Sequence, residues 1–225
     1  FMGVEASRLR IDAGFAKLLP LLHPYMATFL KHQQEFGGAN RVLVAVVARD
    51  GTIFTPAYLD ALKGVTDEVF FLPGVDRGRV QSLFTPNVRY TEVVEDGIAA
   101  GNVIPDDFAT TPEGLAVVRD NILKAGIVGR LVANDFSAAI VSAELMEFDP
   151  TSGKRLDFIA VANEIEERVR QKFDADYVPG STVDVHVIGF AKVVGDIAAG
   201  ATRVVIFFLV TFLITAILVY VYSQS

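Results

Sequence analysis

The chain has 225 residues, a formal net charge of −7 and no cysteine. The negative charge argues against a nucleic-acid partner, and the lack of cysteine excludes disulfides and thiolate zinc sites. Hydrophobic residues make up 52% of the chain, which is high for a soluble protein. Because the chain starts at Phe1 and stops soon after its most apolar run, we expect it to be an internal piece of a longer polypeptide.

The first third of the chain alternates between helix and strand signals. Residues 1–39 are predicted to be a lead-in followed by a helix that begins at His23-Pro24-Tyr25. Residues 41–49 (RVLVAVVAR) are a β-branched run, typical of a strand that is buried on both faces. Thr55 and Pro56 supply an N-cap and a first-turn proline, which predicts a helix over residues 55–71.

The middle of the chain is less regular. Pro73-Gly74 ends the preceding helix, and residues 75–85 are predicted to form a second strand. Residues 86–135 lack clear periodicity, so they are expected to be an insertion with a helix of its own. Residues 136–148 alternate between apolar and polar side chains, which predicts the third strand.

The strongest helical pattern lies in residues 154–173. Its apolar positions follow helical spacing, and Glu164 and Arg168 form a favourable i,i+4 pair on the opposite face. Residues 182–188 alternate valine with polar residues and predict the fourth strand. The glycine-punctuated residues 189–202 are predicted to form a linker helix.

This order predicts an α+β fold. Two split βαβ halves form a ferredoxin-like sandwich, in which a four-stranded antiparallel sheet carries two helices on one face. We expect residues 40–188 to form this domain, with the helical insertion at 86–135 inside it. One transmembrane helix would follow.

The predicted transmembrane helix covers residues 203–223. Val204 to Val221 carries no charge over eighteen residues, and a helix of that length spans about 27 Å, close to the apolar thickness of a bilayer. No ionisable side chain lies in the run, so this helix cannot relay protons. The residues expected to face lipid or neighbouring helices include Val204, Phe207, Phe208, Phe212, Leu213, Leu218 and Tyr220.

Catalytic and metal-binding signatures are weak. The three histidines do not share metal-ligand spacing, and neither a phosphate-binding glycine loop nor a nucleophile elbow occurs. We therefore predict no enzyme activity, no cofactor and no metal. A membrane-anchored enzyme stays open as an alternative, provided that the fold brings Asp106, Glu144 and His186 together.

Four polar residues are candidates for contact with a substrate. Ser142 and Glu144 share the polar side of one predicted strand, and Asp184 and His186 share that of another. The simpler interpretation is a solvated sheet face. The alternative is a polar patch that lines a ligand groove.

Three stretches carry a resemblance to a known family. They are His23-Pro24-Tyr25, residues 36–41 (FGGANR), and the junction from Gly189 to Tyr222. Together they resemble the first extracytoplasmic loop and second transmembrane helix of the RND superfamily of transporters, in particular the MmpL-like predicted exporters. The resemblance covers residues from about Asp12 to Ser225.

The resemblance implies a piece of a proton-driven exporter of hydrophobic or lipid-like molecules. Its porter subdomain would be ferredoxin-like and would lie in the periplasm, with the span in the bacterial inner membrane. Its partners would be the bilayer, a hydrophobic substrate, the remaining transmembrane helices, a second porter domain and further copies in a homo-oligomer.

A charge pattern favours a different arrangement. Lys192 and Arg203 precede the apolar run and no basic residue follows it, so the positive-inside rule would put the globular part in the cytoplasm. The alternative function is therefore a single-span, membrane-anchored ligand-binding or sensor module.

Overall fold

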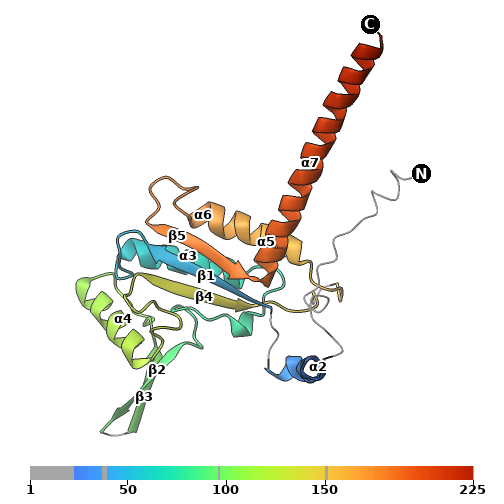
Figure 1. The fold of residues 1–225 in the computed structure, drawn as a ribbon. Helices are drawn as coiled ribbons and strands as arrows, with labels where there is room; N and C mark the ends of the chain where they lie inside the picture. Colours follow the sequence, from blue (N-terminus) through green and yellow to red (C-terminus); the bar gives the residue numbers. More distant parts are fainter. Residues whose placement is uncertain (1–22, 37–39, 96, 150–151, 225) are drawn as a thin grey trace.

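A computed structural model describes residues 23–36, 40–95, 97–149 and 152–224 (Figure 1). Most of the predicted lead-in, residues 1–22, lies outside this part. The described chain is a mixed α and β body from which one long C-terminal helix projects, which confirms the predicted α+β class with one apolar helix.

The main sheet has three antiparallel strands in the order β4-β1-β5. They are β1 (Arg41–Ala48), β4 (Ala138–Glu144) and β5 (Val183–Gly189). In β1, alternate residues from Val42 to Ala48 are buried and those between them are partly exposed. The sheet therefore buries one face fully and leaves the other face more open.

The prediction of a regular strand at residues 75–85 is wrong. This segment holds the short 3-10 helix η2 (Arg77–Arg79). It forms two isolated bridges, one from Gln81 to Ser142 of β4 and one from Val75 to Leu145, the residue after β4. The Asp76 carboxylate accepts a hydrogen bond from the Gly78 amide at 3.1 Å, which favours a turn over an extended chain. The alternation of apolar residues here reflects an irregular segment packed against the edge of β4.

Helices cover the buried face of the sheet (Figure 1). α3 (Pro56–Phe70) buries Leu59, Leu62 and Val65. The second covering helix is α5 (Phe158–Ile165), which continues through the π-helical turn η3 (Glu166–Arg170) into α6 (Gln171–Phe173). It starts later than predicted because Asp157 caps its N-terminus.

The region predicted as a helical insertion also contains a β-hairpin. Its strands are β2 (Arg89–Val94) and β3 (Gly97–Asn102), and the predicted helix follows as α4 (Pro112–Lys124). Thr111 caps α4 as its sequence suggests, because its hydroxyl accepts a hydrogen bond from the Gly114 amide. The hairpin has a glycine- and alanine-rich second strand, which hides it from strand propensity.

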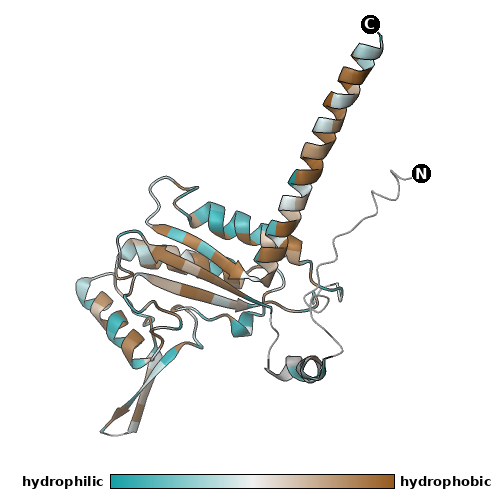
Figure 2. Cartoon of the chain, viewed as in Figure 1, coloured by the Kyte–Doolittle hydropathy of each residue, from teal (hydrophilic) through white to brown (hydrophobic). Residues whose placement is uncertain are grey.

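Helical segments occur at both ends of the described chain. α2 (Pro24–Phe36) agrees with the predicted first helix. α7 (Phe190–Ser223) is one continuous helix of 34 residues that joins the predicted linker and the predicted transmembrane segment. It is roughly 51 Å long, and it is the one helix among the described residues that is long and apolar enough to cross a membrane (Figure 2).

Candidate functional site

The open face of the sheet carries three cross-strand rows of side chains. Residues opposite one another in paired strands point to the same side, so each row shares a face. Written in the order β4, β1, β5, the rows are Ser142–Leu43–Ile188, Ile140–Ala45–His186 and Ala138–Val47–Asp184. We call these nine residues the open face. None of the described helices lies across it (Figure 1).

All four predicted substrate-facing residues point to this side of the sheet. Ser142, Asp184 and His186 belong to the rows above, and Glu144 continues the series opposite Arg41. Ser142 and Glu144 are buried, whereas His186 is exposed.

The four residues do not converge into one polar site. Glu144 and Asp184 lie at opposite ends of the rows, six residues apart along β1, which corresponds to about 20 Å. Arg79 Nη1 donates to both Glu144 carboxylate oxygens at 3.1 Å, and Arg49 pairs with Asp184 at 3.7 Å. Each carboxylate is thus matched by its own arginine, at its own end of the sheet.

The centre of the open face is aliphatic. Leu43, Ala45 and Ile140 fill it, and Ile188 on the edge strand is 61% exposed. Among the described residues, no group of three or more His, Cys, Asp or Glu side chains could hold a metal ion. An apolar strip with charged ends suits contact with an amphiphilic molecule, and it lacks a nucleophile paired with a base.

The junction between the sheet and α7 is the second candidate site, and it contains no loop. Gly189 ends β5 and is also the residue before α7, with φ of 154°. A Cβ at Gly189 would lie 2.6 Å from the Arg41 carbonyl oxygen, so only glycine fits this backbone and this contact. The sheet therefore passes directly into the long helix.

The first turns of α7 pack tightly against α5. Ala191, Val194, Gly195 and Ala198 are buried there. A Cβ at Gly195 would lie 2.4 Å from the Ala162 Cβ, and the rings of Phe158 and Phe190 meet edge to face at 5.6 Å. Close backbone approach through small residues fixes the direction in which α7 leaves the body.

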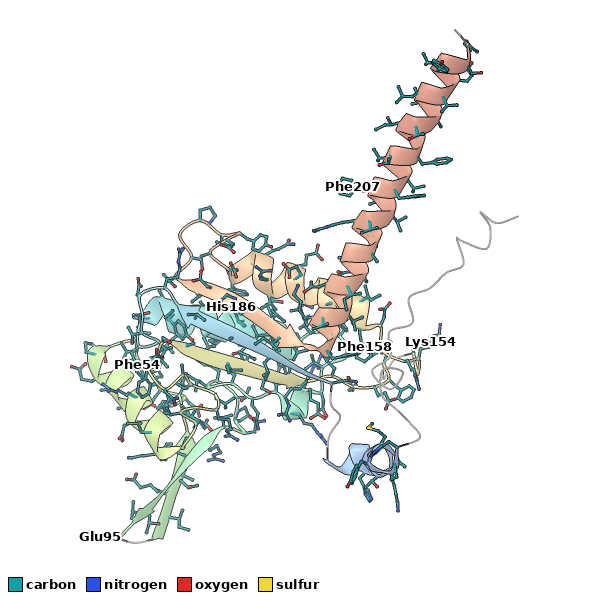
Figure 3. The ribbon with its side chains drawn as sticks, viewed as in Figure 1. Phe54, Glu95, Lys154, Phe158, His186 and Phe207 are labelled. Carbon is teal, nitrogen blue, oxygen red and sulfur yellow. The ribbon has the colours of Figure 1, made fainter. Side chains whose placement is uncertain are left out.

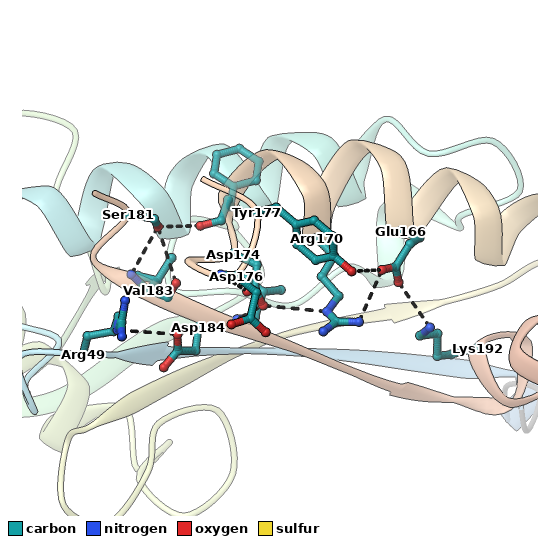
Figure 4. Close-up of polar contacts among 12 residues, drawn as sticks. Arg49, Glu166, Arg170, Asp174, Asp176, Tyr177, Ser181, Val183, Asp184 and Lys192 are labelled. Carbon is teal, nitrogen blue, oxygen red and sulfur yellow. Dashed lines mark hydrogen bonds and ion pairs between the residues drawn. The ribbon is translucent and has the colours of Figure 1, made fainter. Parts of the chain in front are cut away.

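Polar contacts also tie α7 to η3, the π-helical turn that continues α5 (Figure 4). Glu166 accepts hydrogen bonds from Arg170 at 3.3 Å and from the Tyr177 hydroxyl at 3.2 Å. Its other carboxylate oxygen lies 3.2 Å from Lys192 Nζ on α7. Arg170 also pairs with buried Asp174, which accepts a hydrogen bond from the Val185 amide of β5. We call Lys192, Glu166, Arg170 and Asp174 the ionic ladder.

Lys192 keeps its charge within the ladder. Burial opposes the charge, but the carboxylates of Asp196 at 2.6 Å and Glu166 at 3.2 Å together outweigh it, so the pKa of Lys192 is raised above its ordinary value. The ladder begins at the π-helical turn of residues 166–170, and such turns are frequent at functional sites.

Sequence patterns alone do not single out the junction as a site. Gly195 is the one residue that points to it, because a glycine inside a helix costs about 1 kcal/mol of helix stability relative to alanine. Such a glycine usually marks a place where the helix packs closely against a neighbour. The ladder left no comparable signal, since the π-helical turn that orients Glu166 and Arg170 has no sequence signature.

Comparison with known proteins gives one distant relative. No model of a known protein family matches the chain. A protein of Methanocaldococcus jannaschii named "Putative membrane protein MJ1562" is 22% identical over 179 residues, which cover 76% of this chain and 41% of the relative. The chain therefore spans about two fifths of that protein's length. The relative and the apolar α7 together support membrane association.

Proposed function

We propose that the chain is a piece of an RND-type, proton-driven exporter of hydrophobic or lipid-like molecules. It would supply one extracytoplasmic porter subdomain and one membrane span. The observation that carries the proposal is the loop-free passage from β5 through Gly189 into α7, because it joins the sheet to the long apolar helix without a linker.

The order of the elements supports a ferredoxin-like porter subdomain. β1, α3, β4, α5 and β5 follow one another as two βαβ halves would, and the two bridges of residues 75–81 stand where the fourth strand belongs at the edge of β4. In this proposal, residues 75–81 take the place of the fourth, edge strand of the ferredoxin-like sheet, and only the two bridges of that strand are formed. The second porter domain, the other transmembrane helices and the proton relay would be supplied by further parts of the polypeptide.

The open face would be the substrate surface. Its aliphatic side chains match an acyl or other apolar group, while Asp184 and Arg49 at one end, with His186 in the neighbouring central row, match a polar head. No cofactor enters the proposal. The globular part would be periplasmic and the span would lie in the inner membrane of a bacterium.

An export assay tests the open face. In the full-length protein, Ile188→Asp would put a charge on the aliphatic strip, and efflux of a lipophilic fluorescent dye from cells should fall several-fold. Val117→Asp on α4 is the matched control, since Val117 is also an exposed β-branched aliphatic residue, with 48% of its surface accessible, and it lies away from the open face. Equal efflux by the two variants would remove the open face from the transport path.

The alternative is a single-span, membrane-anchored ligand-binding or sensor module with a cytoplasmic domain. Lys192 and Arg203 before the apolar run favour it. The two proposals differ in which side of the membrane the globular part occupies, so topology separates them.

Because this chain has no cysteine, labelling can report topology cleanly. Val117→Cys on α4 marks the globular part and Tyr222→Cys marks the far end of α7; the two side chains are 48% and 86% exposed. In the full-length protein, with any other cysteine changed to serine, an impermeant maleimide should label Val117→Cys in intact cells. Tyr222→Cys should react only after the membrane is opened. The reverse pattern would support the sensor module.

A further inference from the structure

The outer edge of β5 is closed along its first part. In the sheet β5 pairs with β1 alone, and the Arg49 amide donates to the Thr182 carbonyl at 3.0 Å. The even-numbered residues of β5 therefore bond to β1, and the odd-numbered residues turn their backbone groups outward. The Asp174 carboxylate fills the start of this outward row, because it accepts a hydrogen bond from the Val185 amide at 2.8 Å.

The rest of the edge is open. Within the described part of the chain, no hydrogen bond reaches the Val185 carbonyl or the Val187 amide. The side chains of His186 and Ile188 beside them are exposed (Figure 3). We call the outward backbone groups of residues 185–189 the free edge. Donors and acceptors in this alternation are matched by an extended polypeptide that adds a strand.

A second copy of β5 does not fit the free edge. α7 leaves the sheet on the side of β5, past its outer edge (Figure 1). Two β5 strands paired edge to edge about a two-fold axis would send their α7 helices in opposite directions. Two such helices could not enter one bilayer from the same side, so the added strand has to be a different segment.

Residues 8–12 of the chain carry a strand-like sequence. The sequence RLRID alternates two apolar side chains, Leu9 and Ile11, with charged ones, which is the two-residue period of a strand with one apolar face. The segment precedes β1 in the chain. Because Val42 of β1 pairs with Gly189, the chain enters the sheet at the same end as the free edge.

The two faces of this segment match the two sides of the free edge. On the open-face side, its apolar side chains would extend the aliphatic strip beside Ile188. On the other side lies η3, which packs against β5 and carries Glu166 of the ionic ladder (Figure 4). Glu166 Oε2 is buried and has no hydrogen-bond partner among the described residues, although Lys192 Nζ lies 3.2 Å away in an ion pair. The Arg10 guanidinium would supply the missing donor.

We propose that residues 8–12 add to the free edge of β5 as a further strand of the main sheet. The pairing widens the open face by one strand and connects the start of the chain to the ionic ladder. The proposal is independent of whether the protein exports a substrate.

Because the chain has no cysteine, a pair of introduced cysteines tests the proposal. In the full-length protein in native membranes, with any other cysteine changed to serine, Ile11→Cys and Ile188→Cys should be joined by a short bismaleimide within one protomer. Mass spectrometry of the linked peptides measures the yield, which should be several-fold higher than for Ile11→Cys with Val117→Cys on exposed α4. Equal yields would overturn the proposal, and so would a link found mainly between two protomers.

Amide exchange at Val187 is the second test. In detergent micelles, we expect this amide to exchange about tenfold or more slowly in the wild type than in a variant with Arg10→Pro and Ile11→Pro. Neighbouring residues of a strand point their amides to opposite sides, so one of the two prolines removes a donor that faces β5.

The control for this test is Ala16→Pro with Lys17→Pro, outside the segment, which should leave Val187 protected. The His186 amide faces β1 and should exchange equally in all three proteins, which shows that the sheet stays folded. Equal exchange of Val187 in the wild type and in the variant at residues 10 and 11 would show that the free edge stays open, against the proposal.

Discussion

Gly195→Ala should destabilise the protein, whereas Gly200→Ala in the same helix should stabilise it. Alanine is favoured over glycine inside a helix by about 1 kcal/mol at either position. At Gly195 the new Cβ would lie 2.4 Å from the Ala162 Cβ on α5, and at Gly200 it would meet nothing within 4 Å. Overpacking of this kind costs about 1–3 kcal/mol, which outweighs the helix gain at Gly195.

Calorimetric unfolding of the two variants in detergent micelles measures the difference. We expect the unfolding midpoint of Gly195→Ala to fall below that of the wild type and the midpoint of Gly200→Ala to rise above it. The pair controls for helix propensity and for the effect of detergent, since both glycines lie in α7. A rise in both midpoints would mean that α7 does not pack against α5 as described.

If the junction couples the sheet to the membrane, Gly195→Ala should also lower export in the full-length protein. The ionic ladder would resist separation of the two helices, because Lys192 of α7 contacts Glu166 at 3.2 Å. Loss of export by Gly195→Ala at a temperature where this variant is still folded would therefore distinguish coupling from simple unfolding. This expectation rests on the proposed function.

Local patterns predicted much of the secondary structure. Thr55, followed by proline, predicts a helix start. Thr111 is followed by proline in the same way, and both hydroxyls accept capping hydrogen bonds at 3.2 Å. The valine-rich runs at residues 41–49 and 182–188 predict strands, and β1 and β5 occupy them to within one or two residues.

The errors lie where side chains or tertiary contacts override a pattern. Residues 75–85 alternate like a strand, yet Gly74 with φ of 81° and the Asp76 side chain turn the backbone. The β3 strand contains two glycines and two alanines and has no strand propensity of its own, so its pairing with β2 decides its conformation.

The candidate site was predictable in part. Strand alternation placed Ser142, Glu144, Asp184 and His186 on one face, and the register agrees with it. Their partners could not be predicted, because Arg79 reaches Glu144 from 65 residues away in sequence. Which residues lie at opposite ends of a sheet depends on strand pairing, which the sequence alone leaves open.

The second large effect is expected in the core, where Tyr58→Phe should lower the stability of the body. The Tyr58 hydroxyl is buried between two strands: it donates to the Val46 carbonyl at 2.7 Å and accepts from the Ala139 amide at 2.8 Å. Burial raises the pKa of Tyr58 well above its ordinary value, so the hydroxyl stays protonated and can donate. Phenylalanine keeps the ring but removes both contacts.

Removing a hydroxyl that serves two buried backbone groups should cost about 1–3 kcal/mol, because a buried polar group without its partner loses the solvation it had in the unfolded chain. Tyr177→Phe is the matched control: its hydroxyl is exposed and donates to Glu166, so we expect a change of no more than about 0.5 kcal/mol. Calorimetry of both variants measures the difference. Equal midpoints would mean that β1 and β4 close together without the hydroxyl, and that the ring alone accounts for the packing of Tyr58 beneath the sheet.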